Sequence, residues 1–161
     1  MCLARHHEPP KRFSITCLGR FDTFLLQWEP PTPRARNCHA NEHDATKDGA
    51  YAVILLTVER QLRLVAVGQA ETGTGADWFV APIGRGRDES GAPNLDHPEV
   101  LRLEVSGQNT GTIGHRIRVK QQQVARGSPS IAGIAAVVGF ERAVIRIEDA
   151  VTRGEEQDEP V

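Results

Sequence analysis

The chain has 161 residues, of which 39% are apolar and 25% charged, and its net charge is −2. These values are typical of one globular domain, and they exclude a protein that coats nucleic acid through a uniformly basic surface, although a local basic groove remains compatible with them. No apolar run approaches the roughly 18 to 20 residues of a membrane span, and the N-terminus has no secretory segment, so we expect a cytoplasmic protein without a membrane partner.

The N-terminal part predicts two strands and a loop. Residues 12–28 have the pattern of a β-hairpin around a turn at 18–20, because β-forming residues flank a glycine there. Residues 29–37 are rich in proline, which lacks the amide donor of regular structure. We therefore expect a loop over 29–37.

An amphipathic helix is expected next. Its apolar residues follow the i, i+3, i+4 spacing of one helical face; they are Ala50, Val53, Ile54, Val58 and Leu62. The helix is predicted to begin near Asn41 or Asp44, because either side chain can accept hydrogen bonds from the free first-turn amides. It is predicted to end near Gln61.

Three strands and a second helix follow in the prediction. The strands are expected at 62–69, 76–82 and 100–107, separated by turns rich in glycine and proline. The connection over 83–99 is long and polar, which indicates a mobile or functional loop. Residues 112–125 fit both a helical face and a strand-like alternation of apolar and basic residues, and we favour the helix.

The rest of the chain predicts closing strands and an acidic tail. The segments 131–140 and 143–149 have strand patterns. The expected organisation is N-terminal strands and a loop over 1–40, a core over 41–150, and a disordered tail over 151–161, which has too few apolar residues to fold. The fold class is therefore α+β, with a central mixed sheet, flanking helices and an N-terminal hairpin.

Two lone acids on neighbouring predicted strands indicate a site. Asp77 lies in "TGTGADWFVAP" between a glycine loop and an apolar run, and Glu104 lies among β-formers in "VLRLEVSG". Two carboxylates about 4 Å apart repel by roughly 4 kcal/mol at an effective dielectric near 20, so they share a proton or bind a cation. Mg²⁺ or Mn²⁺ would relieve that repulsion, polarise a phosphodiester and lower the pKa of a bound water.

This arrangement resembles the core of the PD-(D/E)xK nuclease superfamily. From residue 41 on, the expected order is αβββαβ, with one acid on the second strand and one on the third, so the resemblance implies a restriction-endonuclease-like core. The superfamily places a lysine two residues after the second acid, where this chain has Ser106. Some members supply that lysine from the following helix, which would make it Lys120, and a glutamine of those members would correspond to one of Gln121 to Gln123.

The resemblance implies a metal-dependent nuclease in a defence or mobile-element setting. The implied catalytic residues are Asp77, Glu104, Lys120 and Ser106. The predicted metal ligands, for Mg²⁺ or Mn²⁺, are Asp77, Glu104 and Asp44. Basic residues flank the acids and are predicted to bind nucleic acid, unless they are solvated surface; they are Arg85, Arg87, Arg116 and Arg118. The alternative is a non-catalytic specificity or interaction subunit with a degenerate site and a protein partner.

A second, narrower resemblance covers residues 41–125. The segments "DATKDGAYAVILL", "ETGTGADW" and "LRLEVSG" are similar to a family of small uncharacterised bacterial proteins. That family shares an acid-Ala-Thr-acid-x-Gly-Ala helix, a Gly-Thr-Gly-Phe-Asp-Tyr-Trp segment and an Ala-Arg-Leu-Glu-Val-Ser-Gly strand. Its polar positions correspond to Asp44, Asp77, Glu104 and Ser106, which suggests that the serine is a feature of the site. The chain departs from the pattern at Lys47, Ala76 and Phe79, and the resemblance implies no particular reaction.

Other constellations carry weaker signals. His39 and His43 are four residues apart and would share a helical face beside Cys38, a pattern that can hold zinc, but no second ligand pair has finger spacing. Ser106 has His115 downstream as a base, without the Gly-x-Ser-x-Gly elbow of many serine hydrolases. Both alternatives rank below the two-acid site.

Overall fold

Seven strands and four helices make up the part of the chain that the structure describes, residues 1–71, 75–127 and 130–150 of a computed structural model. The helices are α1 (Cys2–His6), α2 (Pro33–Cys38), α3 (Glu42–Leu62) and α4 (Gly114–Arg126). The strands are β1 (Lys11–Cys17), β2 (Arg20–Leu26), β3 (Leu64–Gln69), β4 (Trp78–Pro82), β5 (Leu101–Gln108), β6 (Gly133–Gly139) and β7 (Val144–Asp149). The predicted tail over 151–161 lies outside the described residues.

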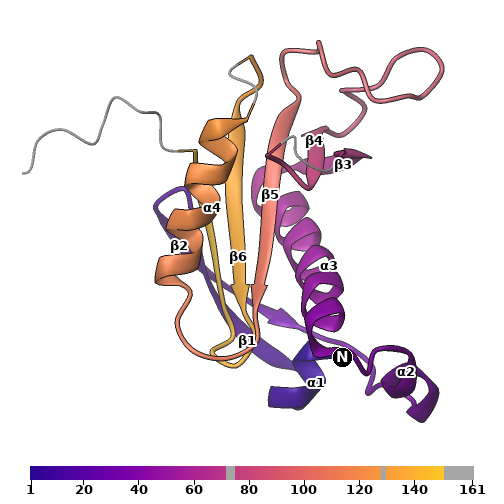
Figure 1. The fold of residues 1–161 in the computed structure, drawn as a ribbon, viewed down its shortest axis with the longest axis vertical. Coiled ribbons are helices and arrows are strands. Elements are labelled where there is room, and N and C mark those ends of the chain that lie inside the picture. The colour runs from indigo at the N-terminus through magenta and orange to yellow at the C-terminus, as the bar shows by residue number, and fades with distance from the viewer. Residues whose placement is uncertain (72–74, 128–129, 151–161) are drawn as a thin grey trace, which may run out of the picture.

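All seven strands belong to one mixed sheet, in the order β2-β1-β7-β6-β5-β4-β3 (Figure 1). β1 and β7 are parallel, as are β5 and β6, whereas the other neighbours are antiparallel. The α+β class, the mixed sheet, both long helices and the N-terminal hairpin are confirmed. Among the described helices, none combines the length and the apolar composition that crossing a bilayer requires.

The predicted loop over 29–37 is wrong, because α2 begins inside it. Pro33 stands in the first turn of this helix, where a missing amide donor costs nothing. Thr32 caps the helix, and its hydroxyl accepts a hydrogen bond from the Ala35 amide at 3.2 Å. Proline excludes a helix interior but favours a helix start, and the prediction applied only the first half of that rule.

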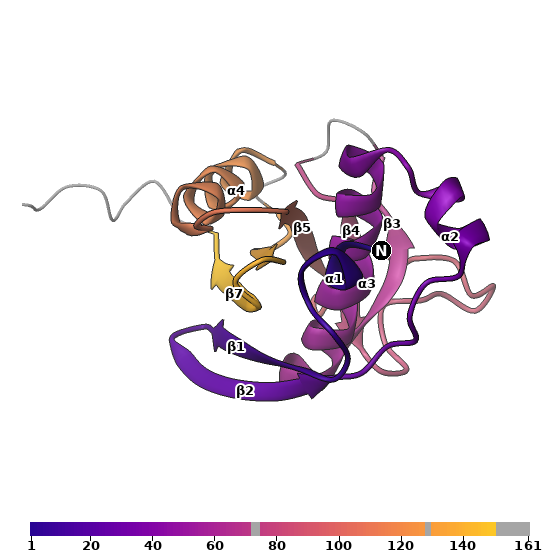
Figure 2. The ribbon, with the colours of Figure 1, turned by 90° about the horizontal axis from the view of Figure 1, so that it is seen from below.

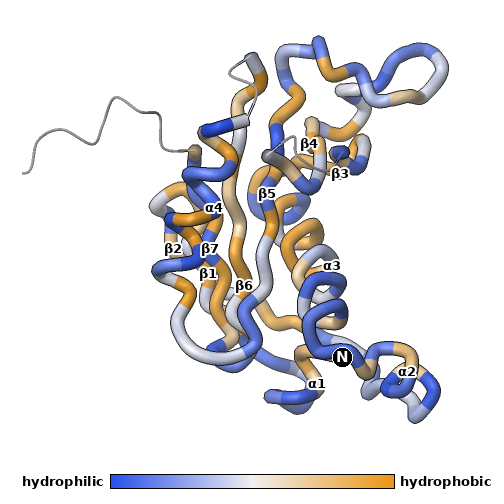
Figure 3. The backbone as a smooth tube through the Cα atoms, in the orientation of Figure 1, coloured by the Kyte–Doolittle hydropathy of each residue, from blue (hydrophilic) through white to orange (hydrophobic). Residues whose placement is uncertain are grey.

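Helices cover the sheet from both sides. On β6, Ile134, Ala136 and Val138 belong to the large core cluster that includes the apolar face of α3. The alternate residues Ala135 and Val137 pack with the apolar residues of α4. Figure 2 shows α3 and α4 on either side of β5. Figure 3 shows a largely apolar β6, while polar residues mark the outer turns of both helices.

β4 is too short to cover its neighbour, and this creates the setting of the site. In the described chain, β4 pairs with β5 only from Val80↔Leu101 to Trp78↔Leu103. β5 continues alongside β6 to Gln108↔Gly139. The second half of β5, residues 104–108, therefore has a free edge between α3 and α4.

α3 can approach this free edge closely because residue 107 is glycine. A methyl group on Gly107 would lie 2.7 Å from the Thr46 carbonyl oxygen and 3.1 Å from the Ala50 Cβ. Asn41 starts this helix: its Oδ1 accepts hydrogen bonds from the amides of His43 at 2.9 Å and Asp44 at 3.4 Å. Asn41 is thus the cap, and Asp44 lies inside the first turn.

Candidate functional site

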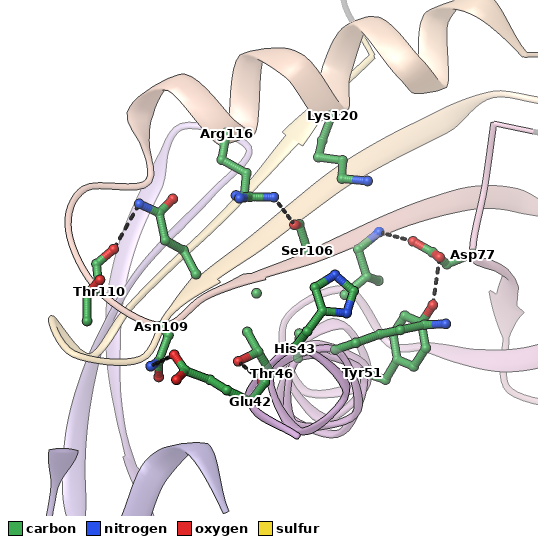
Figure 4. A pocket seen from close by; sticks show the side chains of 15 residues that line it. Glu42, His43, Thr46, Tyr51, Asp77, Ser106, Asn109, Thr110, Arg116 and Lys120 are labelled. Carbon is green, nitrogen blue, oxygen red and sulfur yellow. Dashed lines mark hydrogen bonds between the residues drawn. The ribbon is translucent and has the colours of Figure 1, made fainter. Parts of the chain in front are cut away.

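A pocket of about 710 Å³ opens along the free edge of β5 (Figure 4). Its walls come from the first turns of α3, the end of β5 with the residues that follow it, and α4. A second pocket of about 480 Å³ adjoins it. Lys47, Tyr51 and Asp77 line both pockets, so the two hollows meet at Asp77.

Asp77 closes the free edge of β5 with its side chain. Its backbone amide donates to the carbonyl of Leu103, the last β5 residue paired with β4, at 3.0 Å. Its carboxylate then accepts the next β5 amide, because Oδ2 lies 2.8 Å from the Val105 nitrogen. The other oxygen, Oδ1, accepts the Tyr51 hydroxyl at 2.7 Å. The carboxylate is thus held by one donor from the sheet and one from α3.

Tyr51 is a site residue that the sequence analysis missed. Its ring packs edge-on against Trp78, with ring centroids 5.7 Å apart and planes at 87°. Burial raises the pKa of the Tyr51 phenol, and the hydrogen bond to Asp77 raises it further. Tyr51 therefore remains a neutral donor to Asp77. A signal existed: the only tyrosine of the chain lies outside the apolar face of α3.

Glu104 points to the opposite side of the sheet from its neighbours. Leu103 and Val105 join the core cluster under α3, so the side chain between them faces α4. Lys120 of α4 meets it there, with Nζ 2.5 Å from Glu104 Oε1. Glu104 is only 7% exposed, and this burial raises the pKa of its carboxyl. The Asp77 charge also raises that pKa, whereas Lys120 lowers it.

The two predicted acids are neighbours, although Asp77, which was expected on a strand, directly precedes β4. The antiparallel register ends with Trp78 paired to Leu103, and Asp77 bonds to Leu103 through its amide and to Val105 through its carboxylate, on either side of Glu104. Both acids line the second pocket, and after burial the Asp77 charge also raises the pKa of Glu104. The structure therefore brings together Asp77, Glu104 and Lys120.

Ser106 and Arg116 lie on the wall of the first pocket. An Nη of Arg116 donates to the Ser106 hydroxyl at 3.2 Å, and Figure 4 shows this pair between α4 and β5. His115, the base expected for a serine hydrolase, lines neither pocket. The serine hydroxyl is therefore oriented by a guanidinium.

Several predicted site residues lie elsewhere. Asp44 is on the exposed first turn of α3, about 10 Å along the helix axis before Tyr51, and its carboxylate is 3.7 Å from His43 Nδ1. Three of the predicted arginines, Arg85, Arg87 and Arg118, lie outside both pockets. Arg85 Nε is 3.8 Å from Glu99 Oε2, and Arg87 donates to the Gly91 carbonyl at 2.6 Å. Arg118 is exposed. The structure thus does not bring Asp44 to the two acids, and of the four predicted arginines only Arg116 reaches a pocket.

Where the two pockets meet, the carboxylates of Asp77 and Glu104 are the candidate donors to a metal. Within the described residues, no group of three or more His, Cys, Asp and Glu side chains is placed to hold an ion. His39 caps the end of α2 and His43 is in α3, so the expected shared helical face does not exist. Two carboxylates with solvent fit Mg²⁺ or Mn²⁺, which prefer oxygen ligands and, in the case of Mg²⁺, keep several waters. They do not fit a structural zinc centre, which takes four protein ligands.

Comparisons with protein-family models, with curated proteins and with solved structures found no match to this chain. A functional conclusion therefore rests on the chemistry of the site. That chemistry consists of one carboxylate on β5, a second directly before β4, an amine from α4, and pocket walls that carry further polar groups.

Proposed function

We propose that this chain is a Mg²⁺- or Mn²⁺-dependent phosphodiesterase that cleaves nucleic acid. The observation that carries the proposal is the meeting of Asp77, Glu104 and Lys120 at the free edge of β5. The order α3, β3, β4, β5, α4, β6 also agrees with the αβββαβ order of the PD-(D/E)xK superfamily. Lys120 then stands for the lysine that Ser106 replaces on the strand. The setting in phage defence or on mobile elements stays a prediction.

Asp77 and Glu104 are the residues that would hold the metal ion. When bound, the ion polarises a phosphodiester and lowers the pKa of a bound water. Both carboxylates keep lone pairs for it, because an ionised carboxylate has about four acceptor sites. Each Asp77 oxygen accepts one hydrogen bond, and, among the described residues, Glu104 is bonded through Oε1 alone.

The other side chains supply charge and orientation. The Lys120 amine lies beside Glu104 on the wall of the first pocket, where it offsets charge that grows on the non-bridging oxygens of a phosphate. Ser106 adds a neutral donor on the same wall. Tyr51 and the Val105 amide hold the Asp77 carboxylate in place, so that its orientation is set before substrate arrives.

Metal binding is the first test. Excess Mg²⁺ or Mn²⁺ should raise the melting temperature, because an ion that binds only the folded state stabilises it by mass action. Asp77→Ala and Glu104→Gln should each abolish the shift, whereas Arg118→Gln on the outer surface of α4 should keep it. A wild-type melting curve that is unchanged by excess metal would overturn the metal site.

Cleavage of labelled DNA and RNA tests the reaction itself. Asp77→Ala should remove metal-dependent cleavage, and Lys120→Ala should slow it about 10²-fold, or roughly 3 kcal/mol in barrier. Circular dichroism would establish that both variants are folded. If wild type cleaves neither single- nor double-stranded DNA or RNA, the nuclease proposal is wrong. Equal rates for wild type and Lys120→Ala would remove only the role of Lys120.

A specific feature favours a second function, that of a non-catalytic interaction or specificity subunit. Both acids already have partners from the chain: Asp77 accepts Tyr51 and Val105, and Glu104 pairs with Lys120. These contacts stabilise the sheet edge without an ion. Under this hypothesis, metal leaves the melting temperature unchanged, and the site serves only to hold α3, α4 and β5 together.

A further inference from the structure

We infer that the two pockets form one track for a single strand of nucleic acid, bounded by Lys47 of α3 on one side and by Arg116 and Arg126 of α4 on the other. The inference rests on the proposed function in taking nucleic acid as the ligand, but it concerns binding rather than cleavage. Nothing in the sequence singles out Lys47 or Arg126 as a binding residue. Each is an exposed basic residue on a helix, as many solvated surface residues are.

The two pockets adjoin at Asp77, which lines both. Lys47 and Asp77 line both, Arg116 borders the first pocket, and Arg126 borders the second. Ten residues separate Arg116 from Arg126, which is about 15 Å along a helix. A span of that length can hold only a short stretch of an unpaired strand, with its phosphates near the two arginines. The track therefore matches a short stretch of one strand that passes over Asp77.

The three cations have no acidic partner among the described residues. Lys47 Nζ lies 5.6 Å from the centroid of the Tyr51 ring, and Arg116 contacts the neutral Ser106. Arg126 forms no ion pair within that part of the chain. A cation without an acidic partner can bind phosphate without first breaking an ion pair. These three are therefore better placed to hold a polyanion than Arg85, which faces Glu99.

The acids that line the pockets are largely neutralised by the chain. Glu42 lies 3.9 Å from Arg5 and accepts a hydrogen bond from Asn109, and Glu104 pairs with Lys120. Asp77 accepts only neutral donors. Apart from these paired residues, the charged side chains that line the pockets are three cations, Lys47, Arg116 and Arg126, and one carboxylate, Asp77. The track is thus positive at both ends and negative where a divalent ion would be held.

The depth of the acids points to an unpaired strand. Glu104 is 7% exposed and lies between α4 and the sheet, while Tyr51 approaches Asp77 from α3. Figure 4 shows α4 above and α3 below this edge of the sheet, with Asp77 at one end. A duplex would rest on the two helices with its phosphates outside, whereas a single strand is thin enough to reach the acids between them.

Fluorescence anisotropy tests the track without cleavage. Single-stranded oligonucleotides of about 12 nucleotides and the corresponding duplexes are titrated with protein in EDTA, over a series of salt concentrations. We expect tighter binding of the single strand. Lys47→Gln, Arg116→Gln and Arg126→Gln should each lower the slope of log K against log salt by about 0.7. The double variant Lys47→Gln/Arg126→Gln should weaken binding about tenfold.

Matched controls separate the track from general basicity. Arg118→Gln on α4 and Arg60→Gln at the far end of α3 remove the same charge outside both pockets, and both should bind as wild type does. Equal or tighter duplex binding, unchanged slopes in the three track variants, or no binding by wild type would each overturn the inference. If the protein binds the single strand but does not cleave it when metal is added, the nuclease proposal is wrong and the binding track still stands. Cleavage with unchanged slopes would contradict the track alone.

Discussion

At the scale of single residues, the two acids of the site differ in how the chain neutralises them. Asp77 is held by neutral donors, the Tyr51 hydroxyl and the Val105 amide. Glu104 is buried beside the Lys120 amine, and burial raises the pKa of its carboxyl in spite of that amine. We therefore expect the Glu104–Lys120 pair and the Tyr51–Asp77 contact to affect stability in different ranges of pH.

Lys120→Met should destabilise the protein in a pH-dependent way. Glutamate in an unfolded chain ionises with a pKa of about 4.3. Because the folded pKa of Glu104 is raised, the folded state binds the extra proton, and stability falls as pH rises through the window between the two values. In Lys120→Met the folded pKa of Glu104 is higher still, because the amine that lowers it is gone, so the window extends to higher pH. We expect a free energy of unfolding about 2 kcal/mol below wild type at pH 8, with a much smaller difference at pH 4, measured with urea.

The double variant Lys120→Met/Glu104→Gln serves as the control for this prediction. It removes the buried carboxyl together with its partner, so the additional pH dependence should disappear. If Lys120→Met loses the same stability at pH 4 as at pH 8, the loss comes from packing, and the ion pair has no such role.

Tyr51 should resist ionisation in the folded protein. Since the chain has one tyrosine, phenolate absorbance reports on Tyr51 alone. Burial and then Asp77 raise its pKa, so wild type should show no phenolate near pH 10.5, whereas the urea-unfolded chain titrates near the ordinary pKa of about 10. Stability should therefore decline as pH rises above about 10. In Asp77→Asn the pKa should fall only partly, because burial remains; an unperturbed wild-type titration would contradict the Tyr51–Asp77 contact.

At the scale of elements, the site depends on how closely α3 approaches the free edge of β5. Gly107→Ala should force these two elements apart, because the new methyl group would lie 2.7 Å from the Thr46 carbonyl. We expect a loss of about 1–3 kcal/mol in the free energy of unfolding, as for other overpacked sites. The Tyr51 pKa should move toward its ordinary value as α3 shifts. Chemical denaturation and the phenolate titration would measure the two effects.

Gly114→Ala is the matched control for this substitution. Gly114 begins α4, and a methyl group there would meet no atom within 4 Å. Alanine favours a helix over glycine by about 1 kcal/mol or less, so stability should stay the same or rise. Similar losses in both variants would mean that the close approach at Gly107 is unimportant.

At the scale of the whole molecule, the N-terminal hairpin is part of the same core as the site. β1 pairs with β7, and its buried Phe13 and Ile15 belong to one cluster with Ile54 and Val58 of α3. The sheet is continuous from β2 to β3. Unfolding of the hairpin should therefore unfold the site.

Phe13→Ala should lower the free energy of unfolding by about 3–5 kcal/mol, as large-to-small changes in a core do. Phe21→Ala, on the same hairpin but 73% exposed, should change it by less than about 0.5 kcal/mol. Trp28 follows the hairpin, and Trp78 stands beside the site. Variants with one tryptophan each should show coincident fluorescence transitions. Separate transitions would show that the hairpin and the site unfold independently.

Local sequence patterns predicted most of the secondary structure and two of the residues at the candidate site. Apolar spacing predicted α3 and α4, alternation and turn residues predicted the strands, and isolated acids between β-formers drew attention to Asp77 and Glu104. These signals are local, because helix and strand periodicities depend on residues a few positions apart. The choice of Lys120 came from a resemblance, and the structure places its amine beside Glu104.

Packing between distant segments of the chain sets which side chains share the site. Tyr51 reaches Asp77 across 26 positions of sequence, and Lys47 and Arg126 border pockets formed by two helices on opposite faces of the sheet. That arrangement depends on the short β4 and on the close packing at Gly107, which no local pattern encodes. For the same reason, no local pattern could show that the arginines of the loop over 83–99 lie outside both pockets. Proximity in a fold is set by packing between distant segments, and a periodicity records only which face of its own element a residue occupies.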